Sequence, residues 1–208
     1  MDFSYSPQEE AYRKEVRSWL EANQPPPLTR AEKDAADEEF LWQRLKAWHK
    51  RLYQGGWAGI SWPKEYGGRG ATFIEQVIFG QELARLQLPV GCNVLAVIMT
   101  GPALMQWGTE AQKKRYLQPI LSGDEIWSEG MSEPGAGSDL AAVQTRAVLD
   151  GDNFVVDGQK IWTTIAHRSH FCQLFVRTDP TVPRHKGMSC LLVDIPLPGV
   201  CQRPAAMP

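Results

Sequence analysis

The sequence predicts an α+β protein in which an all-helical domain at residues 1–124 precedes an antiparallel β-domain at residues 125–208. Two observations lead to this prediction. As far as residue 124, apolar residues recur at intervals of three and four, the period of a helix that buries one face. Beyond it, apolar and polar residues alternate, and Asp-Gly pairs separate the alternating runs, which is typical of β-hairpins.

The first helix is predicted from a capping box, Ser-Pro-Gln-Glu at residues 6–9, with proline at the first helical position. Its apolar face includes Val16 and Leu20. The three prolines at residues 25–27 end this helix, because a proline ring cannot continue it.

A second helix is predicted over residues 40–52, where an apolar stripe runs up to a Gly-Gly pair. Residues 57–70 hold too much glycine and proline for regular structure. Two more helices are predicted from Phe73 onward, and the second, residues 90–107, is rich in small and apolar residues, as in a buried element. A capping box at residues 109–112 opens the last helix.

Strands are predicted where the period of the pattern changes to two. Asp-Gly turns separate the first three of them. The predicted strands are residues 143–149, 153–156, 160–164, 171–177 and 188–195.

Composition excludes several classes of protein. Charged residues make up 22% and hydrophobic residues 43% of the 208 residues, which is ordinary for a soluble globular protein. The net charge of −2 gives no reason to expect a nucleic-acid or membrane-surface partner. With no apolar run of transmembrane length and no signal-peptide pattern, a cytoplasmic location is expected.

The four cysteines and four histidines show no ligand-like spacing. There is no Cys-x-x-Cys pair and no His-Glu-x-x-His sequence, so neither a disulfide framework nor a metal site is expected, and each cysteine is expected to be a small buried hydrophobe. His167 follows the Trp-Thr-Thr run, and a place on a surface loop is the favoured interpretation.

Two short runs carry the functional prediction. Residues 132–139 read Ser-Glu-Pro-Gly-Ala-Gly-Ser-Asp, and residues 158–164 read Gly-Gln-Lys-Ile-Trp-Thr-Thr. The first offers glycines, hydroxyls and backbone amides in one turn, which a loop needs to approach a phosphate or a flavin edge. The second places an indole beside two hydroxyls. Each run alone fits an ordinary turn or a core strand; together they supply the parts of a pocket for a planar cofactor.

The two runs resemble the flavin-binding signatures of the acyl-CoA dehydrogenase family, a Thr/Ser-Glu-Pro-x-Ala-Gly-Ser-Asp loop and a Trp-Ile/Thr-Thr strand. Residues 62–68, Trp-Pro-Lys-Glu-Tyr-Gly-Gly, and residues 108–117, which begin Gly-Thr-Glu-Ala-Gln-Lys, are similar to further segments of that family. The resemblance covers essentially the whole chain and implies the family's N-terminal helical domain and middle β-domain.

The resemblance implies an FAD-dependent oxidoreductase of fatty acid and lipid metabolism. Members of this family desaturate an acyl-CoA thioester between Cα and Cβ. A glutamate removes the α-proton, the β-hydride passes to flavin N5, and the electrons leave to an electron-transfer flavoprotein. The resemblance also implies a homotetramer when the protein is complete.

By position in the signatures, the resemblance assigns roles to individual residues. Ser132 is expected to hydrogen-bond the pyrimidine edge of the flavin, Ser138 to contact the cofactor or the CoA end of the substrate, and Trp162 to pack against the isoalloxazine. Thr164 is expected to donate to N5, where negative charge accumulates. Because Trp162 and Thr164 are two apart on a predicted strand, they are expected to share a face. The expected cofactor-binding residues are Met131, Ser132, Gly137, Ser138, Trp162, Thr163 and Thr164.

The acyl pocket is expected to include Leu95 and Met99, which are four apart and therefore on one face of a predicted helix. Ser138 completes the expected substrate-binding set.

No catalytic base is assigned within the chain. The family's base belongs to a C-terminal helical domain, and the matched motifs end before Pro208, so a truncated and catalytically incomplete chain is expected. Glu133 is expected to be a structural acceptor for loop N–H groups.

Two alternatives stay open. Acyl-CoA oxidases and some flavin monooxygenases share these loops, and the oxygen reactivity of the reduced flavin would separate them. A non-catalytic scaffold or partner subunit is the other alternative.

Overall fold

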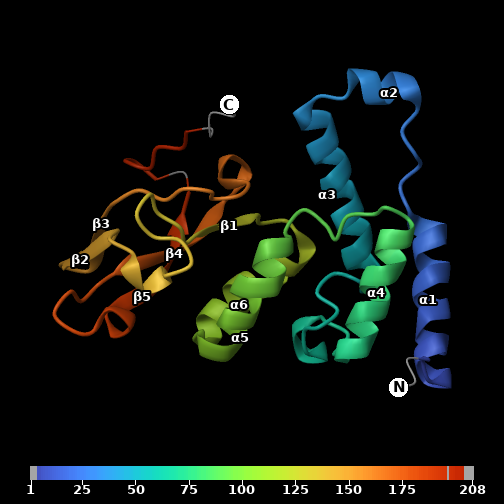
Figure 1. Ribbon diagram of the computed structural model, residues 1–208, viewed down its shortest axis with the longest axis horizontal. Coiled ribbons are helices and arrows are strands. Elements are labelled where there is room, and N and C mark those ends of the chain that lie inside the picture. Colours follow the sequence, from blue (N-terminus) through green and yellow to red (C-terminus); the bar gives the residue numbers. More distant parts are fainter. Residues whose placement is uncertain (1–3, 196, 204–208) are drawn as a thin grey trace. The chain divides into compact units, whose positions relative to one another are not determined.

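The computed structural model describes residues 4–195 and 197–203. The chain divides into two compact units, Met1–Asp124 and Glu125–Pro208. The first is helical and the second contains the sheet (Figure 1). The predicted α+β class is therefore confirmed.

Most α-helices of the first unit begin where the sequence places hydrogen-bonding caps. Ser6 and Thr109 each form a capping box, so two backbone amides that a helix start leaves unpaired are satisfied at each end. The elements are α1 (Pro7–Asn23), α2 (Arg30–Ala35), α3 (Glu38–Gln54), η1 (Lys64–Tyr66), α4 (Phe73–Arg85), η2 (Ala96–Thr100), α5 (Gly101–Trp107) and α6 (Glu110–Ser122).

Helices α1 and α4 are held together by apolar packing and by one buried carboxylate. Val16 of α1 and Ile78 of α4 are both 0% exposed. The Glu82 carboxylate accepts from Arg17 Nε at 3.0 Å and Arg17 Nη2 at 2.7 Å. The side chain of Arg85 also donates to Glu82, at 2.9 Å. A buried carboxylate with these guanidinium partners keeps its charge compensated.

The helix predicted over residues 90–107 is interrupted and only partly buried. Its middle, η2, is a π-helix, in which the Gly101 amide donates to the Ala96 carbonyl. Pro102 explains the change, because it has no amide hydrogen for the next helical bond. Two of its large apolar residues are exposed, Ile98 at 58% and Trp107 at 83%.

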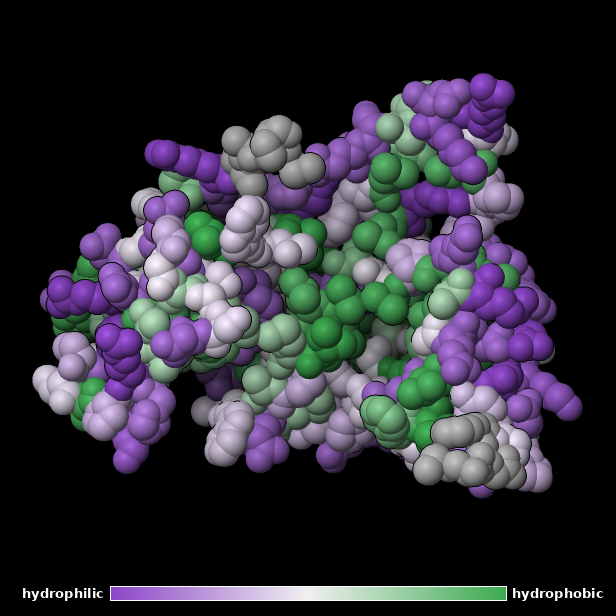
Figure 2. Space-filling model, viewed as in Figure 1, coloured by the Kyte–Doolittle hydropathy of each residue, from purple (hydrophilic) through white to green (hydrophobic). Residues whose placement is uncertain are grey.

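Some apolar side chains of the helical unit lie at its surface, as the green areas in Figure 2 show for the face in view. On α4, Phe73 is 76% exposed and its neighbours Ile74 and Val77 are also exposed. No helix in the described part of the chain is long and apolar enough to cross a membrane.

The second unit is a five-stranded mixed sheet centred on β4 (Phe171–Arg177). β1 (Trp127–Gly130) runs parallel to β4, with Trp127 opposite Phe171. β5 (Met188–Asp194) is antiparallel to β4. β2 (Arg146–Asp150) and β3 (Asn153–Asp157) form the predicted hairpin, and β2 joins β4 through a single parallel pair.

The sheet is mixed and not antiparallel as predicted, because the chain reaches β4 through crossover connections that leave it parallel to both β1 and β2. It also differs from the predicted strands in three places. β1 was not predicted, because its four residues are all buried and show no alternation. β2 begins at Arg146 rather than at residue 143, since a side chain takes up the two preceding amides, as described below. The predicted strand at residues 160–164 is wrong: this segment is irregular, and Trp162 has φ of +56°.

The prediction for the cysteines is also corrected. Cys92 and Cys172 are buried, whereas Cys190 and Cys201 are exposed. Within the described residues, no group of three or more His, Cys, Asp or Glu side chains is arranged to hold a metal ion.

Candidate functional site

The two signature segments meet at the end of β1. The Ile161 amide donates to the Ser132 carbonyl at 2.9 Å, and Lys160 Nζ donates to the Met131 carbonyl at the same distance. Residues 131–139 and 158–164, which are separated by the β2–β3 hairpin in the chain, thus form one surface within the β-unit. We call this surface the cradle.

The first segment of the cradle is a tight turn. The Glu133 amide donates to the Ala136 carbonyl at 2.8 Å, and the Ala136 amide donates back to Glu133 at 3.1 Å. Pro134 and Gly135 occupy the exposed tip between them. This order suits a turn, because proline presets φ at its first central position.

The Glu133 carboxylate ties three stretches of chain together. It accepts from the Gln144 amide at 2.6 Å, the Thr145 amide at 2.9 Å and Lys160 Nζ at 2.9 Å. Burial by itself raises the pKa of Glu133, but the hydrogen bonds from Thr145, Gln144 and Lys160 outweigh it and lower that pKa to about 2. The expectation that Glu133 accepts from loop N–H groups agrees with these contacts. A carboxylate this acidic and fully engaged is unsuited to act as a base near neutral pH.

The second segment of the cradle passes close to Thr145 before it reaches Trp162. Gly158 has φ of +155°, and a Cβ placed there would lie 2.4 Å from Thr145 Oγ1. Only glycine fits this approach. The glycine diverts the chain out of the sheet after β3, which is why the alternating pattern that follows does not form a strand.

Trp162 is presented to the surface in a strained conformation. Its φ of +56° is left-handed, and a bulky residue in that region carries a strain of about 1–3 kcal/mol. Its side chain is not packed in the core, since 78% of the residue is exposed. A large aromatic residue that is both exposed and in a strained backbone conformation is typical of a binding surface.

The hydroxyls of the second segment differ in their surroundings. Thr163 Oγ1 is buried and has no hydrogen-bond partner in the described part of the chain. Thr164 is exposed. The expectation that Trp162 and Thr164 share a strand face rested on a strand that does not form, so the alternation argument does not apply to them.

The glycines of the first segment leave space for a ligand. Gly135 and Gly137 do not have positive φ, and a Cβ on either would meet no atom within 4 Å. Neither the backbone nor the packing therefore requires glycine at these positions. Ser138 beside them is exposed, and Ser132 is half-buried.

These features fit a flat aromatic cofactor such as FAD. The exposed indole of Trp162 supplies a face for stacking, the unpaired Thr163 hydroxyl supplies a hydrogen bond that the fold does not use, and the bare glycine turn allows close approach. Of the expected cofactor-binding residues, all seven lie in the two segments that the structure brings together.

The expected acyl-pocket residues lie in the helical unit. Leu95 precedes η2 and Met99 lies within it, and both are half-buried. Ser138, the third member of the expected substrate-binding set, belongs to the β-unit.

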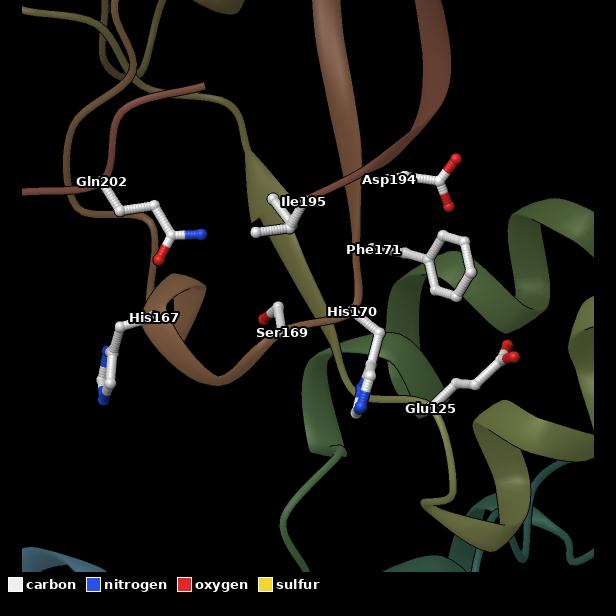
Figure 3. A pocket seen from close by; sticks show the side chains of 8 residues that line it. All are labelled: Glu125, His167, Ser169, His170, Phe171, Asp194, Ile195 and Gln202. Carbon is white, nitrogen blue, oxygen red and sulfur yellow. The ribbon is translucent and has the colours of Figure 1, made fainter. Parts of the chain in front are cut away.

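A separate cavity of about 480 Å³ opens at the other end of β1 (Figure 3). None of the expected site residues lines it. His167, in the exposed turn η4 (Ala166–Arg168), is one lining residue, and His170 Nδ1 accepts from the Ile126 amide at 2.9 Å. In Figure 3, Asp194, Phe171 and Glu125 line one side. The cavity is lined by Glu125, His167, Ser169, His170, Phe171, Asp194, Ile195 and Gln202.

Lys160 is the site residue that sequence reasoning missed. It belongs to the second segment and its ammonium contacts the first, yet the signatures assign it no role. The available signal was its charge. Lys160 is the basic residue of one signature and Glu133 an acidic residue of the other, and two runs expected to meet at one cofactor bring such charges together.

Comparisons with known proteins find relatives of both units. Residues 6–124 match the N-terminal domain of acyl-CoA dehydrogenases, and residues 128–207 match their middle domain. Acyl-CoA dehydrogenase IpdE1 of Mycobacterium tuberculosis is 41% identical over 94% of this chain and 51% of its own length. The short-chain-specific acyl-CoA dehydrogenase of Clostridium acetobutylicum is 34% identical over 93% of this chain and 49% of its own.

Solved structures show the same likeness. In the ChsE4-ChsE5 complex from Mycobacterium tuberculosis, one chain superposes with a TM-score of 0.79 at 38% identity, covering 94% of this chain and 49% of that chain. The Tcur3481-Tcur3483 steroid ACAD gives a TM-score of 0.76 at 40% identity, with 93% and 49% coverage. The chain therefore spans about half the length of the relatives it matches.

Proposed function

Because this chain belongs to the acyl-CoA dehydrogenase family, we propose that its β-unit holds FAD at the cradle in an enzyme that desaturates an acyl-CoA thioester between Cα and Cβ. The observation that carries the proposal is the conformation of Trp162, which is strained, 78% exposed and joined to the glycine turn by the backbone bond from Ile161 to Ser132. When bound, FAD would supply a hydride acceptor for the β-carbon.

The residues of the cradle have distinct proposed tasks. Trp162 stacks on the aromatic ring system and shields it from water. Ser132 and Thr164 supply donors to the polar edge of the ring. The hydroxyl of Thr163, which has no hydrogen-bond partner among the described residues, gains one. Donors already in place where negative charge develops stabilise the transition state more than the ground state.

The proton acceptor for the α-carbon is not proposed among the cradle residues. Glu133 is the carboxylate buried there, and its two oxygens are occupied by the Gln144 and Thr145 amides and by Lys160. A pKa of about 2 also disfavours it as a base.

The acyl group is proposed only as a class. Relatives include a dehydrogenase described as short-chain specific and a structure described as a steroid ACAD, so the acyl groups in this family differ greatly in size. We propose that Leu95 and Met99 contribute to the acyl pocket. We propose an electron-transfer flavoprotein as the electron acceptor. A further structural relative, 28% identical, comes from a structure described as an electron transferring flavoprotein of Acidaminococcus fermentans.

The experiment that tests the reaction is anaerobic mixing of an FAD-loaded form that spans the full length of the relatives with a panel of acyl-CoA thioesters, from short-chain to steroid-derived. Bleaching of the flavin absorbance together with formation of the enoyl-CoA supports a dehydrogenase. Rapid reoxidation by oxygen with release of hydrogen peroxide would indicate an oxidase instead. A full-length form that binds FAD but is bleached by no thioester would contradict the proposed reaction.

A second candidate is a role as one subunit of a two-component assembly. Two of the solved relatives are described by pairs of names, ChsE4-ChsE5 and Tcur3481-Tcur3483. We propose that this chain also assembles with a second acyl-CoA dehydrogenase chain or with further copies of itself. Measuring its mass in solution, alone and after co-expression with candidate partner chains, distinguishes these arrangements.

A further inference from the structure

We propose that Lys160 and Glu133 form a latch that holds Trp162 in its left-handed conformation, so that both act as positioning residues of the cradle. The proposal rests on the proposed binding of FAD at that surface. It assigns to Lys160 a role that neither the signature motifs nor the family comparisons give it.

The latch joins the two signature segments through one side chain. Lys160 Nζ donates to the Met131 carbonyl and to Glu133 Oε1, both at 2.9 Å. The Lys160 and Glu133 side chains are 9% and 6% exposed. Water therefore competes little for these hydrogen bonds, and a charge-assisted bond in such surroundings is strong and directional.

Glu133 extends the latch to a third segment. Its Oε2 accepts from the Gln144 amide and its Oε1 from the Thr145 amide. Thr145 is also the residue against which Gly158 packs. The carboxylate thus fixes the start of β2, the glycine turn and, through Lys160, the segment that leads to Trp162.

The left-handed conformation of Trp162 needs such anchoring, because packing of its own side chain does little to enforce it. A strained φ persists only where the surrounding structure enforces it. With 78% of the residue exposed, packing of the indole does not enforce it. The anchors are instead on the two preceding residues, through Lys160 Nζ and the Ile161 amide, and on the following turn, where the Ala166 amide donates to the Thr163 carbonyl at 3.2 Å.

The position of the contacts also indicates that this ion pair does more than stabilise the fold. An ion pair that only stabilised the fold could lie anywhere in the sheet. This one bridges the two segments that carry every expected cofactor-binding residue, and its lysine lies two positions before the strained tryptophan.

The test compares variants by hydrogen exchange and by FAD binding. The variants are Lys160→Met, Lys160→Arg and the double change Glu133→Gln with Lys160→Met. Lys186→Met is the matched control, since Lys186 is an exposed lysine of the same unit. Hydrogen exchange of peptides covering residues 158–168 is measured without flavin, and FAD affinity is measured by quenching of flavin fluorescence.

The latch predicts that Lys160→Met raises exchange in residues 158–168 and weakens FAD binding at least about tenfold, the loss expected for one buried charge-assisted hydrogen bond. Lys160→Arg keeps the charge and the donors, so its hydrogen exchange and its FAD affinity should both stay close to those of the unaltered protein. The double variant buries no unpaired charge, yet its exchange stays raised, because the link between the segments is still absent. Lys186→Met behaves as the unaltered protein.

Unchanged exchange and unchanged FAD affinity in Lys160→Met would overturn the latch. So would full recovery of both in the double variant, since that would make the buried charge, and not the link, the cause. Should Lys160→Met fail to fold, the double variant gives the same comparison. If the unaltered protein does not bind FAD, the proposed function fails, whereas the exchange measurement still decides the latch.

Discussion

Lys160 Nζ lies 2.9 Å from Glu133 Oε1, and this ion pair connects the two segments that carry the expected cofactor-binding residues. It forms where β1 ends and the chain leaves the sheet. A buried charge pair therefore supports the surface at which we propose that FAD binds, and residues of that surface such as Trp162 and Ser138 are exposed.

Replacing Glu133 by alanine is expected to destabilise the β-unit by about 3–5 kcal/mol, the cost of leaving one partner of a buried ion pair alone. The change also leaves the Gln144 and Thr145 amides without their acceptor. Urea unfolding followed by circular dichroism measures the change in the free energy of unfolding. Asp152→Ala, at the exposed tip of the β2–β3 hairpin, is the control and should change stability by less than about 0.5 kcal/mol. Equal, small effects of the two changes would contradict the role given to Glu133.

Stability of the helical unit is expected to fall as the pH drops below about 6.5, because of His49. This residue is 2% exposed, and its Nε2 lies 3.0 Å from the Leu121 carbonyl. Burial lowers the pKa of His49, so below its ordinary pKa the unfolded state binds a proton that the folded state does not. The unfolded state then gains about 1.4 kcal/mol per pH unit until the folded-state pKa is reached.

Unfolding in urea at pH 7.5 and at pH 5.5 tests this expectation. The variant His49→Gln keeps a donor for Leu121 but does not titrate, so the difference between the two pH values should shrink. An identical difference in both proteins would show that other groups cause the pH dependence.

Replacing Trp162 by glycine is expected to weaken FAD binding while leaving the stability of the fold nearly unchanged. Glycine relieves the left-handed strain, so the free energy of unfolding should stay within about 1 kcal/mol of that of the unaltered protein or rise. FAD affinity should fall at least tenfold, since a stacked aromatic is worth about 1.4 kcal/mol or more. Trp107→Ala removes a tryptophan that is just as exposed, from the helical unit, and should leave FAD affinity unchanged. A large loss of stability in Trp162→Gly would mean that the indole serves the fold.

In a form that spans the full length of the relatives, replacing Met99 by tryptophan is expected to shift the preference among acyl-CoA substrates toward shorter chains. A larger side chain on the half-buried face of η2 takes up pocket volume, and each methylene excluded is worth roughly 1–3 kcal/mol of discrimination. The ratio of kcat/KM values across a series of straight-chain acyl-CoAs measures the shift. An unchanged profile would remove Met99 from the proposed pocket.

Local sequence patterns were enough to predict most of the helices, but they predicted a smaller part of the sheet. The caps at Ser6 and Thr109 and the prolines after α1 act within a few residues, so they can be read directly from the chain. β1 has no such local signal, because burial on both faces removes alternation. Its parallel pairing with β4 joins residues far apart in the chain.

The candidate site shows the same division. Motif matching found the two segments, and the role of Glu133 followed from the need of loop amides for an acceptor. The irregular course of residues 160–164 could not be predicted, since it depends on Gly158 packing against Thr145 and on Lys160 reaching Glu133. These contacts join residues that are far apart in the chain, and they override a local sequence that favours a strand.

The central claim is that the cradle binds FAD, and titration of the chain with FAD tests it most directly. Fluorescence quenching and the visible circular dichroism of the flavin would follow the binding. Because the chain spans about half the length of its relatives and the described donors come from one unit, weak, saturable binding in the micromolar range is expected, without dehydrogenase activity. Thr163→Val and Trp162→Gly should each weaken it at least tenfold, while Trp107→Ala should not. Equal affinity in all four proteins, including the absence of binding in every one, would contradict the account.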